Sequence, residues 1–198
     1  TPNVICPDRF DPVARNVLQY FPDPNLPGDP FTNTNNFISQ AGSDQQIDSF
    51  MIRVDHNLTD SQRIFGRFSY NYQRFNPANV LNNVADFNGN PYSDKIKNFA
   101  LSHTNTFNPT TILNVRYGLG RQRQLNDSAS SGFDVTTLGF PASLRDQFTF
   151  PLFPRFDIGG FTSLGTQFFS LIDVANTTQS LAANLSKVIG RHSIEAGV

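Results

Sequence analysis

Three histidines are the residues in this chain best suited to hold a metal ion or to act as a general base. His56, His103 and His192 lie far apart in the sequence, and the single cysteine is Cys6. Protein metal sites usually combine histidine with cysteine or carboxylates at short spacing. We therefore expect no metal site and no cofactor. His56 and His103 fall instead in phase with apolar residues near predicted strand ends, where a side chain with a polar tip suits an interface.

The stretch SHTN (102–105) holds a serine, a histidine and an asparagine, which are residue types used by hydrolases. A nucleophile needs its base within hydrogen-bond reach. Ser102 and His103 are adjacent in a predicted strand, and adjacent strand residues point to opposite faces. We therefore expect that the chain is not an enzyme.

Several charged side chains on either side of residue 60 are separated by even numbers of positions, which places them on one face of a hairpin. They can contact a ligand or line a path for one, or they can simply pair across strands and be solvated. The candidates are Arg53, Asp55, Arg63 and Arg67, with Arg116 in a later strand.

The elements that position these charges are predicted strands. In RVDHNLTDSQRIFGRFSYNY (53–72), two alternating runs flank TDSQ, and the opposite face carries residues such as Val54 and Phe68. A soluble sandwich gives this pattern when its apolar face is a core. A membrane barrel also gives it, with the apolar face toward lipid and the polar face toward a wet lumen.

The lengths of the connections favour the barrel. We predict a short helix over 11–21 and then strands separated alternately by short turns and by long connections, 75–94 and 125–174. Compact soluble domains rarely carry such long loops, whereas outer-membrane barrels have short turns at one end and long loops at the other. The predicted strands are 47–58, 62–74, 95–107, 112–124, 177–188 and a sixth from 193.

Composition agrees with this interpretation. The chain has 20 Phe and 5 Tyr but a mean hydropathy of −0.33, so many aromatic residues lie in a polar sequence, as barrels with aromatic girdles require. The 15 basic and 16 acidic residues nearly cancel, which argues against nucleic acid as a partner. The lipid-facing or girdle candidates are Phe68, Tyr70, Tyr72, Phe107 and Tyr117.

Two regions are therefore expected. Residues 1–46 form a loop and helix segment, and 47–198 form part of a transmembrane β-barrel of all-β, antiparallel, up-and-down topology. The sequence opens without methionine and stops within a predicted strand, so we interpret it as an internal fragment of a longer protein.

Several stretches resemble the TonB-dependent outer-membrane transporters, most closely the Oar-like subgroup with a carboxypeptidase-regulatory-like domain. They are NVICPDRFDPVARNVLQYFPDPNLPG, DSFMIRVDHNLTDSQRIFGRFSYN, FALSHTNTFNPTTILNVRYGLGR and VIGRHSIEAGV, in the family's order. Cys6 between Ile5 and Pro7 is a small departure from the family's N-x-I-P element.

The resemblance implies a barrel of about 22 strands in the bacterial outer membrane. It further implies TonB-coupled movement of an unidentified ligand, with lipid as one partner and the TonB complex as another, reached through a plug domain outside this chain. Arg53, Asp55, Arg63, Arg67 and Arg116 would then face the lumen. Two alternatives stay open: a surface-binding barrel or adhesin, and a soluble carbohydrate-binding β-sandwich.

Overall fold

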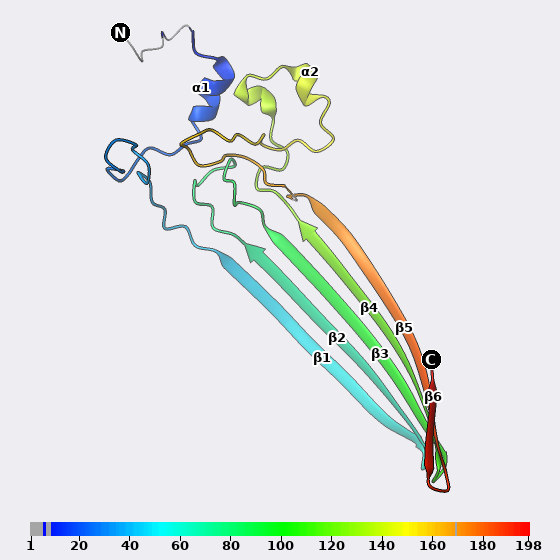
Figure 1. Cartoon of the computed structure of the whole chain (residues 1–198). Helices are drawn as coiled ribbons and strands as arrows, with labels where there is room; N and C mark the ends of the chain where they lie inside the picture. Colours follow the sequence, from blue (N-terminus) through cyan, green and yellow to red (C-terminus); the bar gives the residue numbers. More distant parts are fainter. Residues whose placement is uncertain (1–5, 7–8, 169) are drawn as a thin grey trace. The chain divides into compact units, whose positions relative to one another are not determined.

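Six strands form one sheet in the computed structural model, which describes residues 6, 9–168 and 170–198. The strands follow one another in chain order as an antiparallel meander and lie side by side in Figure 1. In the last hairpin, for example, Ile189 pairs with His192 and Leu185 with Ala196. The strands are β1 (Asp44–Thr59), β2 (Gln62–Asn76), β3 (Tyr92–Asn108), β4 (Thr111–Asn126), β5 (Ile172–Ile189) and β6 (His192–Gly197).

The predicted hairpins are confirmed, but the strands are longer than predicted. The short turns lie at 60–61, 109–110 and 190–191, and the long connections cover 77–91 and 127–171. β1 to β5 have 15 to 18 residues each. Most of the added residues lie at the strand ends from which the long connections leave. In β1 and β3 they are polar, 44–46 and 92–94, so they show no apolar alternation.

The chain divides into two compact units. Unit 1 contains Thr1–Gln45, Phe75–Tyr92 and Asn126–Ile172, and unit 2 contains Gln46–Arg74, Ser93–Leu125 and Asp173–Val198. Unit 2 is therefore most of the sheet, while unit 1 assembles the N-terminal segment with both long connections.

The predicted helix exists but is shorter than 11–21. Helix α1 covers Pro12–Leu18, and the carboxylate of Asp11 caps it by accepting a hydrogen bond from the Ala14 amide at 3.0 Å. Pro22 disfavours helical backbone at the residue before it, so the helix ends earlier. Unit 1 also contains a 3₁₀ turn, η2 (Val135–Leu138), and α2 (Ala142–Arg145), neither of which the periodicity predicted. No helix in the described part of the chain has the length and apolarity to span a membrane.

The long connections are folded around a common core and are not open loops. Phe153 is fully buried, and its ring centroid lies 4.7 Å from that of Tyr20 and 4.8 Å from that of Phe133. The core thus joins residues more than a hundred positions apart. Its buried members are Val17, Ala85, Leu138, Phe153 and Leu164.

The sheet of unit 2 has the opposite character, because its apolar residues are exposed. Val54 is 63% exposed and Leu181 70%. A soluble sandwich would cover such residues with a second sheet, but the described residues form only one sheet with named strands. The sandwich alternative is therefore not supported.

Candidate functional site

Ring contacts define one face of the sheet, which we call the apolar face. The ring of Phe50 in β1 lies 5.9 Å from that of Phe68 and 5.5 Å from that of Tyr70, both in β2. Tyr72 shares this face, and the Lys95 ammonium of β3 lies 5.5 Å from its ring centroid. Farther across, the Tyr117 hydroxyl donates to Gln179 at 3.2 Å. Alternation places all five girdle candidates on this one face, and four of them come from β2 and β4.

The fifth girdle candidate, Phe107, is next to the short turn between β3 and β4 and is 58% exposed. It is in phase with Phe99 and Leu101, which are 38% and 37% exposed. Phe107 is therefore an exposed aromatic ring at a strand end, and its place in an aromatic girdle stays a prediction.

Charged residues gather on the other face, the polar face. Arg53 donates two hydrogen bonds to the carboxylate of Asp55, at 2.6 and 2.8 Å, and Arg63 donates a third at 3.0 Å. The guanidinium carbon of Arg53 also lies 4.2 Å from the ring centroid of Phe65. One carboxylate thus holds two guanidinium groups, which gives this cluster a net positive charge.

Neutral polar side chains continue this face across β3 and β4. The Asn114 amide donates to Thr104 at 2.7 Å and to Ser102 at 3.3 Å. Ser102 is only 4% exposed, whereas apolar Leu101 beside it is 37% exposed. The sheet is therefore inside-out relative to a water-soluble protein, since its polar face is the more crowded one.

Two glycines show how closely the polar face is packed. A Cβ added to Gly118 would lie 2.7 Å from the Ser180 hydroxyl, and one added to Gly120 would lie 3.1 Å from the Asn98 amide oxygen. Neighbouring polar side chains thus cover both glycine positions, and a larger residue at either one would require them to move.

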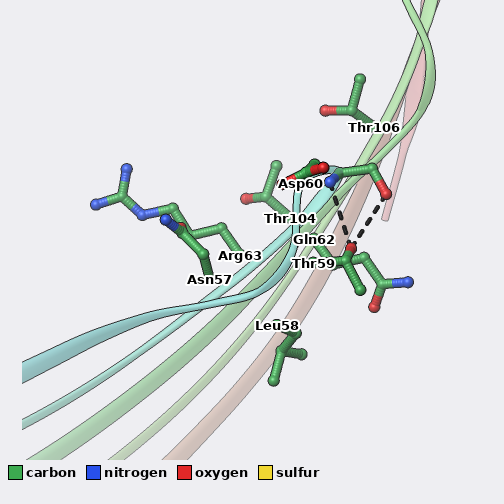
Figure 2. A pocket seen from close by; sticks show the side chains of 9 residues that line it. Asn57, Leu58, Thr59, Asp60, Gln62, Arg63, Thr104 and Thr106 are labelled. Atoms are coloured by element: carbon green, nitrogen blue, oxygen red, sulfur yellow. Dashed lines mark hydrogen bonds between the residues drawn. The ribbon is translucent and has the colours of Figure 1, made fainter.

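An open hollow of about 770 Å³ lies at the short-turn end of the polar face (Figure 2). In Figure 2, Asn57, Arg63 and Thr104 lie on one side of the ribbon and Leu58 on the other. The turn itself is held locally, because the Ser61 amide donates to Thr59 Oγ1 at 3.3 Å, and the Ser61 carbonyl accepts from the Thr106 amide at 2.8 Å. The polar groups lining the hollow suit a hydrogen-bonding partner better than an apolar one.

The five charged candidates are not all brought together. Arg53, Asp55 and Arg63 form the cluster described above, whereas Arg67 of β2 and Arg116 of β4 lie outside it. Both are exposed and in phase with the polar face. They share the face but not the ion-pair network.

The Ser102–His103 pair is separated as the alternation predicted. Ser102 bonds to Asn114 on the polar face, while the His103 ring nitrogen lies 3.3 Å from the Gln62 side-chain oxygen, in phase with the apolar face. Among the residues that the structure describes, no three His, Cys, Asp or Glu side chains are grouped so as to hold a metal.

The family model for the outer membrane β-barrel domain matches residues 1–198, the whole chain. The chain belongs to this family. It is accordingly a protein of the outer membrane, and its six-stranded meander is part of a barrel domain. No curated protein and no solved structure matches it.

Membership of this barrel family explains the inside-out sheet. Transmembrane barrels place apolar side chains toward lipid and polar ones toward the lumen. β1 and β4 have 16 residues each, whereas a barrel strand needs only roughly 9–11 residues to cross a bilayer. At about 3.3 Å per residue, 16 residues extend over about 53 Å. The barrel strands therefore have length to spare beyond the membrane.

Sequence reasoning missed the cations that continue the apolar face of the barrel strands toward their long-connection end, four of which lie in β3 and β4. Lys95 and Lys97 precede Phe99 at two-residue spacing, and Arg121 and Arg123 follow Leu119 in the same way. That spacing is the signal that would have found them.

Carboxylates in unit 1 hold its turns. The pKa of Asp157 is lowered by a hydrogen bond from the Ser163 hydroxyl, at 2.6 Å, and by the Arg155 guanidinium, at 2.7 Å. The pKa of Asp134 is lowered chiefly by the Thr136 amide, which donates to it at 3.0 Å and so caps η2.

Proposed function

We propose that this barrel domain is part of a TonB-dependent, Oar-like outer-membrane transporter. In this proposal the complete barrel has about 22 strands, and a ligand passes through its lumen with energy supplied by the TonB complex. The resemblance of four stretches in the family's order supports the assignment, and membership of an outer-membrane barrel family agrees with it.

The polar face carries the proposal. A path for a hydrophilic ligand needs a wall of hydrogen-bonding and charged groups, and this face supplies the Arg53–Asp55–Arg63 cluster and the Asn114 network. We assign it to the lumen, with Arg67 and Arg116 on the same wall. Phe68, Tyr70, Tyr72, Phe107 and Tyr117 then face lipid or its interfaces.

The hollow beside Arg63 is where we place the contact of this wall with a plug or ligand, because it is open, polar and bordered by one guanidinium. Unit 1, which contains both long connections, would capture the ligand, since loops on a rigid scaffold usually carry recognition.

A surface-binding role is the second candidate, and the folded core of unit 1 favours it. Loops that only border a pore need no buried aromatic core, whereas Phe153 packs between Tyr20 and Phe133. An adhesin would use such a stable, rigid surface to hold a partner without moving it.

Uptake and attachment can be separated in cells that lack the gene. We would supply radiolabelled ferric siderophores, oligosaccharides and peptides to parent and deletion strains, with and without a protonophore that collapses the inner-membrane gradient. A transporter predicts that accumulation of one probe class disappears in the deletion strain and in de-energised parent cells.

The same strains would be scored for attachment to surfaces and to other cells. Loss of attachment with unchanged accumulation of every probe class would replace transport by the adhesin. Accumulation that depends on the gene but not on the gradient would indicate a passive pore and would overturn TonB coupling.

A further inference from the structure

A belt of cations borders the apolar face at the end from which the long connections leave. Its five members come from three adjacent strands, and all are exposed. They are Arg74 of β2, Lys95 and Lys97 of β3, and Arg121 and Arg123 of β4. We call this set the cation belt.

Contacts fix the belt to the apolar face. Lys95 lies over the Tyr72 ring, and Arg121 donates to the Thr177 hydroxyl at 3.0 Å on the face where Tyr117 meets Gln179. His103, eight residues after Lys95, is in contact with Gln62 on the same face. Alternation is therefore unbroken along β3, and it also places Lys97 there.

The belt is only partly neutralised. β2, β3 and β4 contain one acidic residue, Asp94, and it bonds to Gln122 in phase with the polar face. On neighbouring β1, Asp44 and Asp48 are in phase with Phe50 on the apolar face, and their carboxylates accept hydrogen bonds from the Asn76 and Gln46 side-chain amides. Arg123 is paired with Asp173 of β5, its carboxylate 2.7 Å away. Arg74, Lys95, Lys97 and Arg121 form no ion pair with another described residue.

We infer that the cation belt binds the phosphate groups of an anionic lipid in the membrane leaflet at this end of the strands. The belt adjoins the apolar face directly, since Phe99 is two residues from Lys97 and Leu119 two from Arg121. One lipid could thus place its acyl chains on the apolar face and its phosphates among the cations. A soluble anion would gain nothing from the apolar side, which is why we assign a lipid.

This inference rests on the assignment of the apolar face to lipid, and it does not depend on transport. Juxtamembrane cations attract anionic headgroups, and Arg is suited to bidentate phosphate contacts. Several cations within two or three residues of each other make a phosphorylated headgroup the preferred neighbour over a zwitterionic one.

Native mass spectrometry of the full-length protein in a neutral detergent would test it. The probes are bis-phosphorylated lipid A and the same lipid after enzymatic removal of its phosphates. We expect the phosphorylated form to be retained at least about tenfold more tightly, and the preference to fall at high salt because exposed charges are screened. Equal retention of the two lipids by the unsubstituted protein would overturn the inference.

A matched pair of double variants locates the site. Lys97→Gln with Arg121→Gln removes two belt cations, whereas Arg67→Gln with Arg116→Gln removes two exposed cations from the polar face. The belt variant should lose about 10- to 30-fold in binding of the phosphorylated lipid, and the control should keep it. Equal losses in both would overturn the assignment to this face.

The folded state and the source of the phosphate are checked in the same series. Folded barrel is scored by its heat-dependent migration on gels, and single variants replace a double variant that fails to fold. Displacement of bound lipid by millimolar inorganic phosphate would reveal a site for soluble anions and would overturn the lipid assignment. Indifference to inorganic phosphate supports it.

Discussion

An arginine placed on each face of one strand would test the orientation of the sheet most directly. Ile52 and Met51 are neighbours in β1, both apolar, and are 59% and 63% exposed. Ile52 is in phase with Phe50 on the apolar face, and Met51 is in phase with Arg53 on the polar face. The pair thus matches residue class, depth and exposure and differs only in the face.

The expected magnitudes differ strongly. An arginine facing lipid near the middle of a barrel strand costs about 2–4 kcal/mol of folding free energy, which is about a 30- to 700-fold change in the folding equilibrium. An arginine facing a wet lumen should behave as a surface substitution, with a change within about 0.5 kcal/mol. Ile52→Arg should therefore be severely destabilised and Met51→Arg nearly unaffected.

The assay is denaturant titration of the full-length protein in lipid vesicles, with folding followed by tryptic protection and by migration on unheated gels. If both faces met water, the two variants would have equal midpoints. That result, or a larger loss for Met51→Arg, would refute the assignment of the apolar face to lipid.

Three further predictions concern unit 1 and are all measured as protection from proteolysis or hydrogen exchange in the full-length protein. Gly165→Ala should destabilise the unit by several kcal/mol, because φ of Gly165 is +89° and the new Cβ would overlap the Pro154 carbonyl. Gly159→Ala is the control and should have little effect, because the space around Gly159 is open. Equal protection of the two variants would contradict this prediction. Phe153→Ala should lower the stability of the unit by about 3–5 kcal/mol, because a fully buried ring is removed from the aromatic core, and unchanged protection of residues 126–172 would disprove that role. The pKa of Asp134 is lower in the folded state, so its stabilisation of η2 is present above the ordinary carboxyl pKa and is lost as pH falls through the pKa of the folded state. Asp134→Asn keeps a capping oxygen and should abolish this acid sensitivity in the hydrogen exchange of residues 133–140, after correction for intrinsic exchange rates. An unaltered pH profile in this variant would count against the prediction.

The hairpins and their faces follow from the amino-acid sequence alone. Period-two alternation and short turns are local signals, so the order of residues is enough to assign Arg53, Asp55 and Arg63 to one face. The Asp11 cap of α1 is equally local. The true extent of β3 is not, because its first residues are polar on both faces and only pairing with neighbouring strands makes them part of the sheet.

Only the tertiary structure shows whether the apolar face is covered by protein, and whether the long connections are folded around a core. Alternation is the same in a sandwich and in a barrel, and a single sheet with Val54 and Leu181 uncovered separates the two. Likewise, nothing near Phe153 in the chain shows that Tyr20 packs against it. Local sequence sets which way a side chain points from its own backbone, but contacts between distant segments form only when the whole chain folds.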